Sequence, residues 1–206
     1  MEPFEVHLFS RLAEGLLLFD RPNLHEVYVL SLYIDFDEGP HRLKVWLYYN
    51  TLSHLRRAVG QGEDGDEARW YFALWEPDFI TAVGLSTEEC SRLADEECHR
   101  LLAEWLRAYG LYRPPEVIEA MLADRNPAAY NTWEGQVKER LLHLLPAVAR
   151  RLQESGVILA KFGRSVPLLV HEWDYDRWTL EATRRANPTG LIAEFERWVK
   201  REGCLD

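Results

Sequence analysis

Three carboxylates gathered between two apolar segments are the first residues in this chain that could do chemistry. Asp35, Asp37 and Glu38 occupy three of four consecutive positions. Carboxylate oxygens can bind a hard cation or share acid and base work, and Asp35 and Asp37 lie on one side of an extended strand. The segment does not match the spacing of a calcium-binding loop, because the glycine comes at Gly39 and no glutamate follows at the twelfth position. Aspartate and glycine are also what a hairpin turn requires, and we favour that interpretation.

A second polar group follows an expected strand near the C-terminus, in the run HEWDYD at residues 171–176. His171 could bind a metal together with Asp174 or Asp176, although no HExxH or comparable spacing supports such a site. Together with Asp35 and Asp37, these residues would form the metal centre of a hydrolase. The simpler interpretation is that Asp174 or Asp176 caps the next helix. The sequence leaves open whether the two acidic groups meet in space.

Other catalytic and cofactor-binding patterns find no support. Residues 60–65 match the GxGxxG pattern, but the segment before them is helix-like and the segment after them is strand-like. Glu63 and Asp64 would also repel the phosphates of a dinucleotide. No GxSxG elbow, Walker loop, kinase set or Cys/His nucleophile pattern is present. We therefore expect no cofactor.

The cysteines and the apolar segments indicate the compartment. Cys90, Cys98 and Cys204 lack CxxC spacing, which argues against a disulfide framework and against a zinc site. No apolar run approaches the ~20 residues that span a bilayer, and the first residues lack the basic start of an export signal. We expect a cytoplasmic protein with reduced cysteines and no membrane segment.

Charge is distributed unevenly along the chain. The formal net charge is −10, and residues 1–103 contain 9 Lys and Arg against 19 Asp and Glu, whereas residues 104–206 contain 15 of each. Basic residues cluster only in pairs, so no stripe is available for a phosphate backbone and we expect no nucleic-acid partner. An acidic half could attract a basic protein partner, although solubility alone also explains it.

Tryptophan is abundant, with 8 residues in a chain of 206. Trp46, Trp70 and Trp75 lie in the acidic half, close to the expected sheet. Aromatic side chains often anchor protein interfaces, so this coincidence favours a binding surface. Trp70 and Trp75 are five residues apart on an expected strand and must face opposite sides of it. Only one of the two could then point outward.

Residue periodicity predicts an α+β fold with a mainly antiparallel central sheet of about five strands flanked by helices, in one domain over residues 1–206. The strands at 27–36 and 43–49 form a hairpin, and their nearly continuous apolar character indicates burial on both faces. A mobile acidic loop is expected at 60–67. Further strands are expected at 69–75, 79–83, 157–162 and 166–171, and helices at 4–19, 51–58, 87–109, within 113–130, 133–153, 176–186 and 189–201.

A set of short motifs spanning residues 27 to 200 carries a resemblance to a known family. The motifs are Tyr28, the run at 33–37, Asn50-Thr51 with Leu55, Arg69-Trp70 with Trp75, and Asn187-Pro188 before Phe195. In these the chain resembles the bacterial family catalogued as domain of unknown function 4303, although its acidic turn has fewer acids than that family's. The resemblance implies a stand-alone bacterial cytoplasmic protein and transfers no catalytic residue.

Three hypotheses of function follow. The first is a non-enzymatic interaction module, immunity-like or regulatory, that meets a basic partner through Asp35, Asp37 and Glu38 with Trp70 or Trp75 as anchor. The second is a metal-assisted hydrolase that uses these carboxylates with His171. The third is a structural subunit whose aromatic residues are all buried. The oligomeric state does not follow from the sequence.

Overall fold

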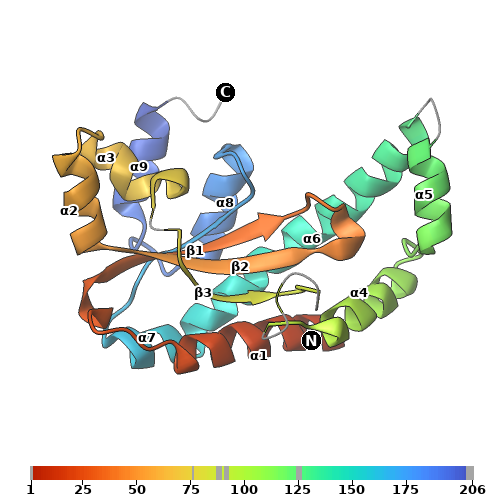
Figure 1. Ribbon diagram of the computed structural model, residues 1–206, viewed down its shortest axis with the longest axis horizontal. Coiled ribbons are helices and arrows are strands. Elements are labelled where there is room, and N and C mark those ends of the chain that lie inside the picture. Colours follow the sequence, from red (N-terminus) through yellow and green to blue (C-terminus); the bar gives the residue numbers. More distant parts are fainter. Residues whose placement is uncertain (1, 76, 87–89, 91–92, 124–126, 203–206) are drawn as a thin grey trace.

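A computed structural model describes residues 2–75, 77–86, 90, 93–123 and 127–202, arranged around a mixed β-sheet (Figure 1). In these residues the sheet has four strands in the order β3-β2-β1-β4. β2 pairs antiparallel with β1 and β3, and β4 lies parallel to β1. The expected α+β fold is confirmed, with one strand fewer than predicted. The strands are β1 (Val27–Asp35), β2 (Lys44–Thr51), β3 (Phe79–Val83) and β4 (Leu168–His171).

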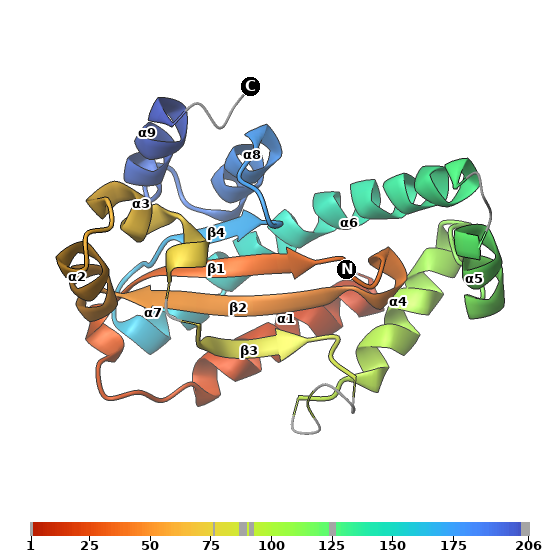
Figure 2. The same cartoon turned by 45° about the horizontal axis from the view of Figure 1, so that its top comes forward.

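One face of the sheet, the back face, is covered by long helices. Side chains alternate along a strand, so Leu30, Leu32 and Ile34 of β1 all point to this side, where they are buried. Figure 2 shows α1 and α6 behind the sheet. At Gly15 an added Cβ would clash with the side chain of Thr81, so a glycine is needed where α1 crosses β3. The covering helices are α1 (Pro3–Leu18), α4 (Glu96–Ala108), α6 (Ala128–Glu154) and α7 (Val157–Phe162).

The opposite face, the front face, is covered over only half of its extent. Val29 and Leu169 pack in a second hydrophobic cluster with side chains of the surrounding helices. Toward the other end of β1 and β2, none of the described helices lies in front of the sheet, as Figure 2 shows. The covering elements are α2 (Leu52–Gly60), α3 (Gly65–Trp70), η3 (Phe72–Leu74), α8 (Arg177–Ala186) and α9 (Ala193–Arg201). The expected burial of β1 and β2 on both faces is therefore wrong at their uncovered end.

Two expected strands are helical. Residues 69–75 form the end of α3 followed by η3, and residues 157–162 form α7. Asp64 begins α3, because its carboxylate accepts hydrogen bonds from the amides of Asp66 and Glu67. α7 lies between Gly156 and Gly163, both with positive φ. These boundaries replace the second hairpin and shorten the expected acidic loop, since helix α3 already starts at Gly65.

The remaining helices lie close to their expected positions, with one shift. The helix expected at 87–109 begins at Glu96, where Asp95 accepts a hydrogen bond from the amide of Cys98; residues 87–89 and 91–92 lie outside the described part. Pro146 lies inside α6 without ending it. α5 (Pro115–Ala123) is the helix expected within 113–130. None of the described helices combines the length and apolar character needed to cross a bilayer.

Candidate functional site

The two acidic groups, at residues 35–38 and 171–176, lie at the same end of the sheet, where β1 and β4 both end. β1 and β4 run parallel with Tyr33 opposite His171, so the chain leaves both strands on the same side. Asp35 forms a turn there, because its carboxylate accepts the amide N–H of Asp37 at 2.9 Å. Glu38 pairs with Lys44 Nζ at 2.6 Å and with Arg42 at 2.9 Å. The turn interpretation of these acids agrees with this geometry, and Glu38 is engaged by two cations.

The predicted metal ligands serve other purposes. Asp176 caps α8 by accepting the amide N–H of Thr179 at 2.8 Å, and the backbone carbonyl of Asp174 accepts from the hydroxyl of the same threonine. Among the described residues, the one group of His, Cys, Asp or Glu side chains close enough to share a metal is His7, Asp95 and Cys98. Asp35, Asp37, His171, Asp174 and Asp176 therefore do not assemble into the predicted metal centre.

His171 is fully buried beside β1. Its Nδ1–H donates to the carbonyl of Glu172 at 2.5 Å, so Nε2 accepts from the hydroxyl of Ser31 at 2.6 Å. The ring packs against Phe72 and Tyr175 at centroid distances of 4.4 and 4.9 Å. Burial lowers the pKa of His171 to about 4, so the ring is neutral at pH 7. A serine and a histidine at this distance could form a nucleophilic pair, but neither exposes any surface to a substrate.

The predicted anchors Trp70 and Trp75 are not at the surface. They are 4% and 6% exposed and belong to the cluster that covers the front face. Trp70 packs against Phe195 and Tyr28 because its segment folds as a helix, which turns its ring toward α9 and β1. Neither tryptophan can therefore anchor a partner, and the prediction that one of them points outward is wrong.

Other aromatic rings are partly exposed on the front face, over its uncovered half and along its border with η3. They form a continuous row across the strands, in which Trp46 meets Phe79 at 5.0 Å and Tyr33 stacks on Phe72 at 5.4 Å. Tyr48 joins the two pairs, and Trp173, which is 63% exposed, ends the row. We call this row the aromatic strip; its members are Phe79, Trp46, Tyr48, Tyr33, Phe72 and Trp173.

Carboxylates border the aromatic strip. Burial, with the negative charges of Asp35, Asp37 and Glu172 adding to it, raises the pKa of Tyr33 to about 12. The pKa of Tyr48 is raised by burial and by Asp35. The strip therefore lies in a field of negative charge supplied by both acidic groups. Sequence reasoning missed most of it, although the alternation of Trp46 and Tyr48 on one strand was a signal that both face the same side.

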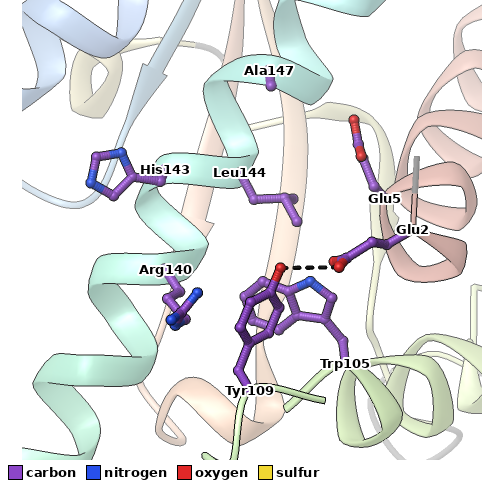
Figure 3. A pocket seen from close by; sticks show the side chains of 8 residues that line it. All are labelled: Glu2, Glu5, Trp105, Tyr109, Arg140, His143, Leu144 and Ala147. Atoms are coloured by element: carbon purple, nitrogen blue, oxygen red, sulfur yellow. Dashed lines mark hydrogen bonds between the residues drawn. The ribbon is translucent and has the colours of Figure 1, made fainter. Parts of the chain in front are cut away.

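A separate hollow of about 530 Å³ lies among α1, α4 and α6 (Figure 3). The Tyr109 hydroxyl donates to Glu2 at 3.0 Å, and the Arg140 guanidinium lies 4.0 Å from the Tyr109 ring centroid. The buried indole nitrogen of Trp105 has no hydrogen-bond partner among the described residues. These helices cover the back face, so the hollow is distinct from the aromatic strip. Its lining residues are Glu2, Glu5, Trp105, Tyr109, Arg140, His143, Leu144 and Ala147.

Comparison with known proteins adds no relative: no family model, curated protein or solved structure matches the chain. The resemblance to the family of domain of unknown function 4303 stays a prediction. The functional argument therefore rests on the geometry of this chain alone.

Proposed function

We propose that this chain is a non-enzymatic interaction protein that binds a basic protein partner on the uncovered half of its front face. One observation carries the proposal: a row of partly exposed aromatic rings crosses the sheet and is bordered by carboxylates. The partner would insert arginine or lysine side chains. An immunity-like or regulatory role is part of the same proposal, and the family resemblance implies a bacterial cytoplasmic protein.

The chemistry of the aromatic strip suits a cationic guest. An arginine guanidinium stacks on the face of tryptophan or tyrosine, and a nearby carboxylate can accept its N–H groups. Tyr33 and Asp35 are neighbours on one strand, so ring and carboxylate can act on the same guanidinium. The net charge of −10 attracts a basic partner from a distance.

Trp46 and Trp173 take the anchoring role that the sequence had suggested for Trp70 and Trp75. Trp46 lies toward the β3 end of the aromatic strip, in contact with Tyr48 and Phe79. Trp173 is the most exposed ring of the strip and follows directly on β4. Tryptophan is the residue most often found at the energetic centre of an interface, so we expect these two to dominate binding.

The hydrolase hypothesis receives no comparable support. Its ligands are divided between a hairpin turn, a helix cap and a fully buried histidine. The third hypothesis, that all aromatic residues are buried, does not apply to Trp173.

Titration with an acetylated, amidated peptide of alternating arginine and glycine tests the proposal. We expect saturable binding that weakens as ionic strength rises, with a matched glutamate peptide inactive. Trp46→Ala should lower the affinity by about tenfold, which is 1.4 kcal/mol. Asp35→Asn keeps the turn and removes the charge, so it should weaken binding and reduce the salt dependence.

Two exposed residues away from the aromatic strip supply the controls. Tyr109→Ala removes a ring that is 38% exposed on the other side of the molecule, and Glu119→Gln removes an exposed charge on α5. Both should leave peptide binding unchanged. Binding that is insensitive to salt, or that Tyr109→Ala weakens as much as Trp46→Ala, would contradict the proposal.

A further inference from the structure

His7, Asp95 and Cys98 meet in the interior between α1 and α4. His7 Nε2 lies 2.9 and 3.0 Å from the two carboxylate oxygens of Asp95. Asp95 is 6% exposed and Cys98 has no exposed surface. One ligand atom from each of the three residues lies within 4.8 Å of the others. An imidazole, a carboxylate and a thiol thus converge in a buried place that the proposed function does not use.

We propose that these three side chains form a binding site for a divalent transition metal of the zinc type. Imidazole, carboxylate and thiolate are all common zinc ligands. Three protein ligands leave a fourth tetrahedral position for water. The inference does not depend on the proposed function, because the site lies behind the sheet and the aromatic strip lies in front of it.

The observed spacing is close to what a tetrahedral metal requires. With zinc bonds of about 2.0–2.2 Å to nitrogen and oxygen, those two ligand atoms stand about 3.3 Å apart, and the sulfur stands about 3.6 Å from either. The His7 and Asp95 atoms need to separate by only a few tenths of an ångström from 2.9 Å. The Cys98 sulfur lies within 4.8 Å of the other two ligand atoms, and zinc binding would bring it to about 3.6 Å from each.

Asp95 can bind a metal and still cap its helix. Its Oδ1 accepts the amide N–H of Cys98 at 3.1 Å, at the start of α4. Each carboxylate oxygen has two lone pairs, so the cap leaves acceptor capacity for a metal. A metal would link this cap to His7 on α1 and so tie two back-face helices together.

Two features of the site weaken metal binding. Burial and the charge of Asp95 raise the pKa of the Cys98 thiol, so the metal must displace the thiol proton, which leaves to solvent as the thiolate forms. The metal also takes the place of the proton that His7 Nε2 donates to Asp95, and the neutral imidazole then carries its one proton on Nδ1. The Arg11 guanidinium lies 3.5 Å from Asp95 Oδ2 and repels a dication. Affinity should rise when the Arg11 charge is removed.

Cobalt(II) titration of the full-length, metal-stripped protein under reducing conditions tests the site. We expect one equivalent to bind, with the visible bands of tetrahedral cobalt and a near-ultraviolet thiolate-to-cobalt band. Cys98→Ser should abolish the thiolate band. Cys90→Ser is the matched control, because Cys90 is outside the cluster, and it should leave both bands unchanged.

A second variant keeps the test decisive if Cys98→Ser does not fold. Arg11→Gln changes a side chain that is 35% exposed and should tighten metal binding by about tenfold, because it removes a positive charge that repels the dication. Zinc should also raise the melting temperature of the wild-type chain. The proposal is overturned if excess cobalt gives no tetrahedral spectrum, or if the thiolate band survives in Cys98→Ser or is lost in Cys90→Ser.

Discussion

The two halves of the front face both carry several aromatic side chains, but they differ in how deeply these side chains are buried. In the covered half, Tyr175 and Phe195 are buried in a cluster with Trp70. In the uncovered half, Trp46 and Tyr48 of β2 are only partly buried. Aromatic residues in the first half hold the fold together. Those in the second half are only partly buried, and we assign their exposed surface to binding.

The largest expected effect is a difference in unfolding free energy between alanine substitutions in the two halves. Phe195→Ala removes a fully buried ring and should lower the free energy of unfolding by about 3–5 kcal/mol. Phe79→Ala, in the aromatic strip, should cost about 1 kcal/mol, because its ring is already partly exposed. Urea unfolding followed by circular dichroism measures both. Equal losses would remove the distinction between the halves.

Acid should lower the free energy of unfolding, because it protonates His171 in the covered half. Its pKa of about 4 lies below the unfolded value of about 6.5, so folding favours the neutral ring. The resulting stabilisation is complete above pH 6.5 and declines as the pH falls toward 4. The difference corresponds to about 3 kcal/mol. An NMR titration of the His171 ring measures this directly, and a pKa near 6.5 would show that the pocket is open to water.

A smaller loss of unfolding free energy is expected when one tyrosine hydroxyl is removed from the covered half. Tyr175 donates to the carbonyl of Trp70 at 2.9 Å and accepts the amide N–H of Phe72 at 3.3 Å. Tyr175→Phe leaves that carbonyl unsatisfied in the interior and should cost about 1–2 kcal/mol in unfolding free energy. Tyr48→Phe is the matched control, since the Tyr48 hydroxyl bonds to no described residue, and it should change stability by less than about 0.5 kcal/mol. A larger loss in the control would contradict this assignment.

The smallest stability effect belongs to the most exposed ring of the aromatic strip. Trp173→Ala should change the unfolding free energy by no more than about 0.5 kcal/mol, because the ring is 63% exposed. The same substitution should weaken binding of the arginine peptide. A variant that lost stability and kept its affinity would reverse the role that we assign to Trp173.

The sequence predicted those helices and strands in which apolar residues repeat at a regular spacing over many positions. α1, the hairpin of β1 and β2, and α6 all follow from spacing of apolar residues over many positions. Residues 157–162 were misjudged because a short segment with five apolar residues out of six fits a strand and a helix equally well. The glycines on either side, both with positive φ, were the available signal for a helix.

The sequence analysis named two carboxylates beside the aromatic strip but missed most of its rings. Asp35 and Asp37 were singled out, and they border the aromatic strip. Trp70 was misplaced because Asp64 was assigned to a loop, whereas it caps the helix that turns Trp70 inward. The exposure of Trp46 could not be derived, because it depends on where α3, α8 and α9 end in space and not on the local pattern of β2.

The indole N–H signals of the tryptophans, observed by NMR in a 15N-labelled chain during titration with the arginine peptide, test the central claim most directly. The account predicts that the signals of Trp46 and Trp173 shift, while those of the buried Trp70, Trp75 and Trp198 stay in place. Shifts confined to the buried indoles, or no shift at saturating peptide, would contradict it.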